Sequence, residues 1–333
     1  MVWKALDALK SRLQYFIIIS MAAGLANVYF FGGWEVPRKF LVGIVIFLVI
    51  YPLMINAKFE EVIRHLRHPR PIFCSFVVNF LLSPIIAYII GIIFFRNYPE
   101  LFIVLIFLSM VPTSAMSAAW TALSGASMST VLYLIPANLL FAAFVALPIV
   151  LPLMVDGKIE LNSFVIARTI LIVFLLPMVL GDLTRRVLTA RLGEKRLASI
   201  NPRLGSVSAV GLVILLFLVM SLQRNAGLFE EGRLLLSIFP ALIAYYGLLY
   251  GVSGVWARVL TAKEILPGEK AVVIVYTSVA RHVNICLALV LTAFPLEQTA
   301  VMVIFLMAAY VLQVPSLAFY ARHEGRRLAA GSP

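Results

Sequence analysis

Residues 101–124 read LFIVLIFLSMVPTSAMSAAWTALS, an apolar run long enough to cross a bilayer but interrupted near its middle. The interruption runs from Val111 to Ser117, where Pro112 lacks a backbone N–H and clashes with the preceding helical turn. Irregular backbone at membrane depth survives only inside protein or beside a water-filled cavity. The stretch therefore predicts a broken membrane-spanning helix inside a larger bundle. The alternative is a simple kink whose freed carbonyls are satisfied by the neighbouring hydroxyls.

The composition of the whole chain places it in a membrane. Of its 333 residues, 62% are hydrophobic and 13% are charged, and the mean hydropathy is +1.03. Soluble domains average roughly 45–50% apolar and about 25% charged residues. So much apolar surface cannot be hidden in a soluble globule of this size, and two cysteines are too few for a disulfide scaffold. The composition predicts an all-α membrane protein.

Apolar runs of about 20 residues predict ten transmembrane helices. A helix on the membrane surface is expected at 2–12 and a second one at about 59–67. The alternative that the first apolar run is a cleaved signal peptide stays open. The predicted spans are 13–33, 39–56, 71–95, 101–124, 128–155, 164–182, 204–222, 234–257, 270–294 and 298–320.

Lysines and arginines gather in alternate loops of this map. The larger group lies before span 1, after span 10 and in the loops that follow spans 2, 6 and 8. Because cytoplasmic loops carry the excess of positive charge, both termini are predicted to be cytoplasmic, in a cell inner or plasma membrane. The same loops account for the net charge of +12, so no nucleic-acid partner is expected.

The ten predicted spans divide into two halves of five, 1–160 and 161–333. Because five is odd, the second half enters the membrane from the opposite side. Span 9 is interrupted at Thr277–Asn284, which matches the break in span 4, although no Gly or Pro lies between Glu269 and Phe294. Matching interruptions in two halves are the best sequence indication of a transporter binding site. We therefore predict two inverted five-helix repeats whose broken helices 4 and 9 cross.

These features resemble the bile acid:sodium symporter superfamily, which includes the arsenite efflux permeases. The sharpest likeness is to the span 4 motif of the permeases, and weaker ones occur in spans 5, 6 and 9. The resemblance implies a panel domain of spans 1, 2, 6 and 7 and a core domain of spans 3, 4, 5, 8, 9 and 10. The residues that carry it are Pro112-Thr113-Ser114-Ala115-Met116 with Trp120, Asn138, Pro177 with Gly181, Arg185 and Arg186, and Asn284-Ile285-Cys286-Leu287-Ala288.

Departures from the family pattern fall on the chemistry of transport. The resemblance places an arsenic-binding cysteine where this chain has Thr113, and a glutamate where it has Cys286. The sodium-coupled branch relies on a span 9 carboxylate, but no Asp or Glu occurs at 101–155 or at 270–296. Cys286 is either a relocated thiol ligand or a small core residue.

Arg281 stands in the middle of span 9. An Arg at the centre of a spanning helix costs roughly 2.5–3.5 kcal/mol on insertion scales and normally faces the bundle interior. We hypothesise that its guanidinium takes the place and charge of the family's bound sodium and favours an anionic solute. The alternative is a structural Arg bonded to carbonyls that the broken helices free. His282 is likewise either a proton-coupling group or a neutral ring bonded within the bundle.

The favoured function is secondary-active transport of a small organic anion by alternating access, without a requirement for sodium. The alternatives are an arsenite or metalloid efflux permease and a sodium-coupled symporter of bile-acid-like or carboxylate solutes.

An ATP-driven pump has no support, because no GxxxxGK[ST] phosphate loop occurs. A membrane enzyme that uses Thr113 or Ser114 with His282 is the least favoured reading. The expected partners are the solute, the bilayer and a coupling ion, sodium or proton. No catalytic residue, metal or cofactor is expected. The residues expected to line the site are Thr113, Ser114, Ser117, Asn138, Thr277, Ser278, Arg281, His282, Asn284 and Cys286, with Pro112 at the break.

Overall fold

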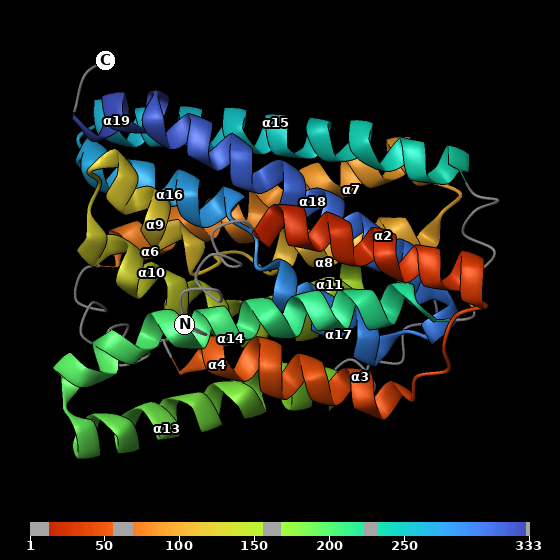
Figure 1. Ribbon diagram of the computed structural model, residues 1–333. Coiled ribbons are helices and arrows are strands. Elements are labelled where there is room, and N and C mark those ends of the chain that lie inside the picture. The colour runs from red at the N-terminus through yellow and green to blue at the C-terminus, as the bar shows by residue number, and fades with distance from the viewer. Residues whose placement is uncertain (1–12, 56–68, 156–167, 223–231, 331–333) are drawn as a thin grey trace. The chain divides into compact units, whose positions relative to one another are not determined.

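The computed structural model of the chain describes residues 13–55, 69–155, 168–222 and 232–330 (Figure 1). Within these ranges nearly every residue is helical, and the only β pairing is an isolated bridge between Trp34 and Leu222. The all-helical fold class is thereby confirmed. The surface helices predicted at 2–12 and at about 59–67 lie outside the described residues.

Six helices of the described part are long and apolar enough to cross a membrane. Two shorter helices, Tyr15–Phe31 and Pro99–Met110, are also apolar. These helices fit an integral membrane protein, while the full set of ten spans and the inverted repeat stay predictions. The six are Arg70–Phe94, Met128–Met154, Arg203–Met220, Leu236–Ala262, Gly268–Ala293 and Gln298–Arg322.

The chain divides into two compact units. Unit 1 consists of Met1–Ala57, Phe164–Leu235 and Leu287–Met307, and unit 2 of Lys58–Ser163, Leu236–Cys286 and Ala308–Pro333. Spans 1, 2, 6 and 7 fall mainly in unit 1, and spans 3, 4, 5 and 8 fall mainly in unit 2. Spans 9 and 10 are divided between the units. The end of span 9 and the start of span 10 fall in Leu287–Met307 of unit 1, and the rest of both spans falls in unit 2. The predicted division into repeats, and into panel and core, stays a prediction.

Unit 1 is built on long helices that lie side by side. Helix α14 packs between α2 and the rod formed by α3, η1 and α4, and α13 packs against α4 (Figure 1). A Cβ at Gly24 would lie 2.6 Å from the Met220 Cβ, so only glycine permits the close approach of α2 and α14. The elements are α2 (Leu13–Phe31), α3 (Arg38–Ile44), η1 (Val45–Ile50), α4 (Tyr51–Met54), η4 (Leu171–Leu175), α13 (Leu176–Leu192) and α14 (Glu194–Met220).

Unit 2 contains most of the remaining helices. Helix α17 (Val283–Ala293) begins in unit 2 and continues into unit 1, and α18 (Leu296–Arg322) runs from unit 1 into unit 2. Helix α15 (Gly232–Ala262) belongs to unit 2 from Leu236 onward. The other elements are α6 (Arg70–Phe76), η2 (Val77–Leu82), α7 (Ser83–Phe94), α8 (Pro99–Met110), α9 (Met116–Ser124), α10 (Met128–Phe141), η3 (Ala142–Val150), α11 (Leu151–Val155), α16 (Gly268–Val279) and α19 (Glu324–Ala329).

Helix α8 and the interrupted span Gly268–Ala293 are buried more deeply than the other spans. In the window of Gly268–Ala293, 94% of residues are buried, compared with 39% for Arg70–Phe94. The described residues of α8 from Leu101 to Met110 are likewise all buried. A helix buried all round is expected in the interior of a bundle, where its backbone can be irregular without meeting lipid.

Candidate functional site

The first break lies between α8 and α9. Helix α8 begins with Pro99 and Glu100, which suit a helix N-terminus, and ends at Met110, just before Pro112. Thr113 has φ of 65°, in the left-handed region that a β-branched residue rarely adopts. The chain resumes a helix at Met116. This interruption coincides with the one predicted from the sequence.

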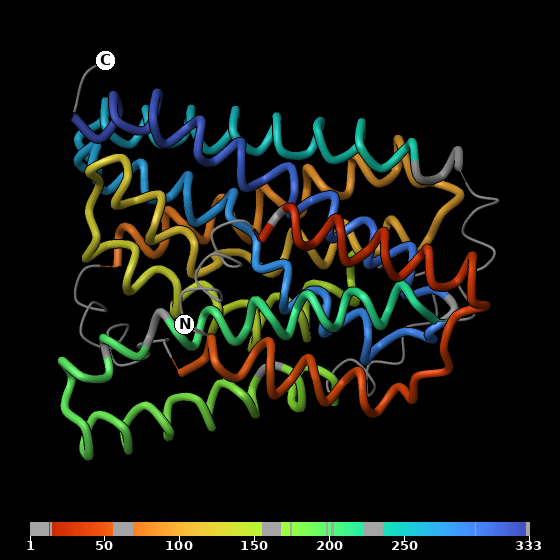
Figure 2. The backbone as a smooth tube through the Cα atoms, viewed as in Figure 1, coloured from red at the N-terminus to blue at the C-terminus, as the bar shows by residue number. Residues whose placement is uncertain are grey.

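The second break lies between α16 and α17, where the tube in Figure 2 loses its helical coil. Helix α16 ends at Val279 and α17 begins at Val283. The side chain of Gln313 bonds the backbone between the two helices. Its Oε1 accepts the Arg281 N–H at 3.1 Å, and its Nε2 donates to the Arg281 carbonyl at 3.2 Å. A side chain from another helix therefore satisfies the irregular backbone here, without Gly or Pro.

The two breaks satisfy each other's backbone groups. The Ser114 N–H donates to the Ala280 carbonyl at 2.7 Å, and the His282 N–H donates to the Val111 carbonyl at 3.1 Å. Both pairs lie within unit 2. Because buried backbone groups must be paired, these reciprocal bonds explain how two unwound segments persist deep in the protein. The two broken helices thus meet at their interruptions.

Hydroxyl groups from the first break and from the first turn of α9 cap the end of α16. The Thr113 Oγ1 donates to the Thr277 carbonyl at 2.8 Å, and the Ser117 Oγ donates to the Tyr276 carbonyl at 3.3 Å. The last four carbonyls of a helix have no partner within the helix. The Thr113 hydroxyl supplies a donor for Thr277, whereas the Tyr276 carbonyl also accepts the Ala280 N–H at 3.0 Å.

The side chain of Arg281 caps the end of α8 in the opposite direction. Its Nη1 donates to the Ser109 carbonyl at 2.9 Å, and its Nη2 donates to the Ser83 Oγ at 2.6 Å. The Ser83 hydroxyl also lies 2.9 Å from the Tyr245 hydroxyl. Arg281 is fully buried, and its Nε has no hydrogen-bond partner in the described part of the chain.

No carboxylate of the described residues forms an ion pair with Arg281. The C-terminal end of a helix carries a partial negative charge, equivalent to roughly half an elementary charge. The end of α8 therefore offsets only part of the guanidinium charge. Among the described residues, no carboxylate is paired with the remainder of that charge.

A chain of buried amides and hydroxyls extends from the crossing to span 3. Asn138 donates from Nδ2 to the Thr113 Oγ1 at 2.9 Å and to the Ser75 Oγ at 3.0 Å. Asn79 in turn donates to the Ser75 Oγ at 3.1 Å, and its own Oδ1 is buried without a partner among the described residues.

Sequence reasoning missed Ser75, Asn79 and Ser83 of this network, as well as Gln313. The first three recur every four residues, which places them on one face of a helix. That spacing of polar residues in an apolar span was the available signal.

The remaining predicted residues are placed less directly at the crossing. The hydroxyls of Thr277 and Ser278 donate to carbonyls of their own helix, at 2.9 Å and 2.7 Å. The Cys286 thiol is buried and contacts the Phe107 carbonyl at 3.7 Å. Asn284 is partly exposed in the first turn of α17, and the His282 side chain is buried.

The geometry gives no support to a nucleophile activated by His282. The Thr113 hydroxyl donates its proton to the Thr277 carbonyl, and the Ser114 Oγ accepts the Met116 N–H at 3.3 Å. A catalytic hydroxyl needs a base within hydrogen-bond reach. Among the described residues, neither hydroxyl is directed at a base by these bonds.

Interrupted spanning helices that meet at buried polar groups define a class, the secondary transporters. The model of the Sodium Bile acid symporter family matches residues 43–227, more than half of the chain. The chain belongs to this family and is a membrane transporter of that type. The matched residues include the first break and Asn138 but end before the second break.

Two relatives were found among curated proteins. The arsenical-resistance protein Acr3 of Alkaliphilus metalliredigens (strain QYMF) is 24% identical over 238 residues, which is 67% of each chain. A protein of Bacillus subtilis (strain 168), YbaS, described as uncharacterized, is 20% identical over 289 residues, 86% of this chain and 88% of that one.

Proposed function

We propose that the protein is a secondary-active transporter of a small organic anion, that it works by alternating access, and that it does not require sodium. The observation that carries the proposal is the fully buried guanidinium of Arg281 at the end of α8, without a carboxylate partner among the described residues. Transporters of broken-helix type use half-helix C-termini and unwound carbonyls to coordinate a cation. Arg281 supplies a fixed cation to one such helix end.

The fixed charge has two consequences for transport. A monovalent cation placed beside the guanidinium would be repelled, since two unit charges 4 Å apart interact by about 4 kcal/mol at an effective dielectric constant of 20. An anionic group is attracted for the same reason, and an Arg with a spare N–H donor suits a carboxylate or phosphonate. The Nε of Arg281 is that spare donor.

The proposed solute site comprises the hydroxyl and amide groups that surround the two breaks. Thr113, Ser117 and Asn138 present polar groups there, and Ser114 is partly exposed. The neighbouring candidates are Thr277, Ser278, His282, Asn284 and Cys286. In this proposal both termini are cytoplasmic, which a reporter fused to the C-terminus would test.

The test is thermal stability of the purified protein in detergent, because a ligand that binds only the folded state raises apparent stability by mass action. Sodium, pH and a panel of small carboxylates and phosphonates are varied one at a time. A stabilising anion is then tested on Arg281→Gln, with the exposed Arg322→Gln as the matched control. Arg281→Lys keeps the charge and serves as a second variant.

We expect an organic anion to stabilise the wild type and Arg322→Gln, and Arg281→Gln to lose that response. Flux of the labelled anion into vesicles should fall in parallel. Equal stabilisation of Arg281→Gln by the anion would overturn the proposal. A clear rise with sodium would instead support the sodium-coupled alternative, which the family description favours.

A second candidate function, arsenite efflux, is favoured by the similarity to Acr3. The buried Cys286 thiol would then serve as the metalloid ligand after the crossing opens. This function predicts arsenite resistance in cells that express the protein, with resistance lost in Cys286→Ala and kept in Cys74→Ala, which removes the other buried thiol. Absence of resistance in the wild type would remove this candidate.

A further inference from the structure

Unit 1 contains a cavity of about 430 Å³ that shares no residue with the crossing. It lies beside α3, the start of span 6 and the end of α17. Its volume falls in the range typical of small-molecule pockets, roughly 300–1,000 Å³. Its wall combines three cationic side chains, two threonines and an apolar patch. The lining residues are Arg38, Lys39, Val42, Arg168, Thr169, Ile172, Val173 and Thr292.

One of the three cations is held in place by the end of a helix. The Nε of Arg38 donates to the Leu291 carbonyl at 3.0 Å, and its Nη2 donates to the Thr292 carbonyl. Both carbonyls belong to the last turn of α17, which ends at Ala293. The guanidinium is therefore positioned by the protein itself, and its remaining N–H groups bond no other described residue. Preorganisation of this kind lowers the entropic cost of binding.

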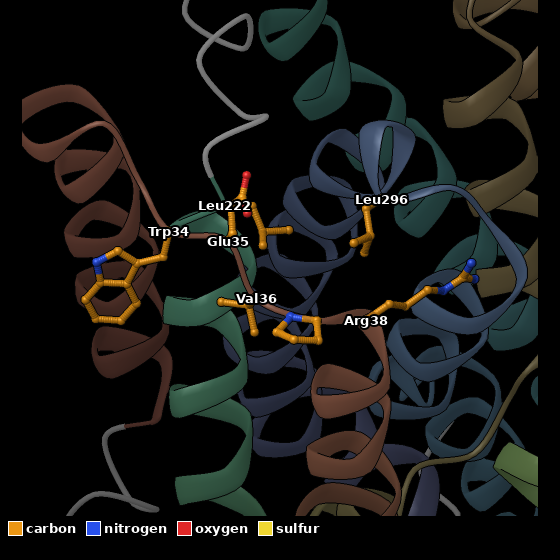
Figure 3. Close-up of a pocket in the computed structure, with 7 residues that line it drawn as sticks. Trp34, Glu35, Val36, Arg38, Leu222 and Leu296 are labelled. Carbon is orange, nitrogen blue, oxygen red and sulfur yellow. The ribbon is translucent and has the colours of Figure 1, made fainter.

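The other two cations are not neutralised by any described carboxylate. Neither Lys39 nor Arg168 takes part in an ion pair within the described residues, and the lining includes no Asp or Glu. Glu35 lines a neighbouring pocket that Arg38 also lines, and Figure 3 shows the Glu35 carboxylate and the Arg38 side chain extending in different directions. Three cationic side chains in one lining, with no carboxylate among the lining residues, give the cavity a positive potential.

We propose that this cavity is a second binding site, which accepts a phosphate oxyanion between Arg38, Lys39 and Arg168. Arg forms bidentate bonds to phosphate, and Lys adds a mobile point charge. The apolar side chains of Val42, Ile172 and Val173 border the rest of the ligand. By the predicted topology Arg38 and Lys39 lie at the non-cytoplasmic side. The oxyanion belongs either to a soluble phosphate compound or to the headgroup of an anionic lipid.

The experiment measures binding and does not depend on transport, so its result is independent of the proposed function. In the first arm, thermal stability in detergent is followed against potassium phosphate, with potassium chloride of equal ionic strength as the reference. In the second arm, stability is compared in nanodiscs of phosphatidylcholine alone and of phosphatidylcholine with phosphatidylglycerol in equal parts. Potassium salts keep any sodium effect out of both arms.

The variants separate a specific site from general surface charge. Lys39→Gln with Arg168→Gln removes the two cations that have no described partner. Lys39→Arg with Arg168→Lys keeps the charges, and Arg96→Gln removes an exposed cation outside the cavity on the same predicted side. Hydrogen bonds to charged groups contribute enough that each lost cation should weaken phosphate affinity about tenfold.

We expect the wild type, Arg96→Gln and the charge-preserving pair to respond in at least one arm, and the double Gln variant to lose that response. A response to free phosphate identifies a soluble ligand, whereas a response only to phosphatidylglycerol identifies a lipid headgroup. The proposal is overturned when the wild type responds in neither arm, or when the double Gln variant responds as the wild type does.

Discussion

The half-helices α8 and α16 both end at the crossing, but they are capped by different chemistry. Two neutral hydroxyls, Thr113 in the first break and Ser117 in the first turn of α9, donate to the end of α16. The end of α8 instead receives the charged side chain of Arg281 from the second break. A pair of structurally reciprocal ends therefore carries charge at only one of them.

The difference extends to how each break is maintained. The first break combines Pro112 with the left-handed backbone of Thr113, both of which are local features. The second has no Gly or Pro, and Gln313 from α18 bonds both backbone groups of Arg281 in addition to their partners within the turn. The first break thus has local features in its own backbone, whereas the second has a side chain from a distant part of the chain bonded to its backbone. The proposed anion preference comes from the second break alone.

The largest effect on stability is expected from Thr113→Val, which keeps the shape of the side chain and removes the hydroxyl. The Thr277 carbonyl and one Asn138 N–H would lose their partner, and a buried polar group left unpaired costs about 1–3 kcal/mol. We expect a loss of about 2–6 kcal/mol in the free energy of unfolding, measured by denaturation in mixed micelles.

The matched control for this change is Thr113→Ser, which keeps both hydrogen bonds and should remain within about 1 kcal/mol of the wild type. A similar loss in both variants would mean that the methyl group, and not the hydroxyl, stabilises the crossing.

A smaller effect is expected from Gln313→Leu. The amide of Gln313 bonds both backbone groups of Arg281, but each of these also has a partner within the turn, at the Val279 carbonyl and the Val283 N–H. The Tyr246 hydroxyl loses its acceptor as well. We expect a loss of about 1–3 kcal/mol, with anion binding weakened because Arg281 is no longer held in place.

Ser316→Ala is the control on the same helix, since it removes the bond from the Tyr250 hydroxyl and the donation to the Gln313 carbonyl but leaves the Gln313 side chain in place. Anion binding unchanged in Gln313→Leu would contradict the role assigned to Gln313 at the second break.

The smallest effect on stability is expected from Ser278→Ala. Its hydroxyl donates only to the Ile274 carbonyl of its own helix, at 2.7 Å, so the change should stay within about 0.5 kcal/mol. Transport and anion affinity are then the informative readouts. A loss of transport at unchanged stability would assign Ser278 to the solute, whereas a large loss of stability would reveal a tertiary partner.

Much of the fold was predictable from composition and hydropathy. The apolar content indicates a helical membrane protein. Pro112 marks the first break, because it directly follows Val111, the residue that caps the C-terminal end of α8. The second break was predicted from polar residues at the matching position, because an apolar helix rarely carries Thr, Ser, Arg, His and Asn together. Both predictions depend on properties of short stretches of chain.

The partners of these residues were less predictable. Ser75, Asn79 and Ser83 have no motif of their own, and each is an ordinary residue for a membrane helix. Their importance comes from the residues that they contact across the bundle. Arg281 can be both a structural side chain and a charge that selects the solute. Its guanidinium caps α8, and its Nε bonds no other described residue.

The sequence by itself determined the class of protein, the helical fold and the two places where spanning helices break. These follow from local hydropathy, from the missing N–H of proline and from the cost of polar groups at membrane depth. Only the tertiary structure decided which donors satisfy the broken ends, because the partners are distant in the chain: Ser83 lies 198 residues from Arg281. Hydrogen bonds between such distant groups depend on packing, which no local pattern encodes.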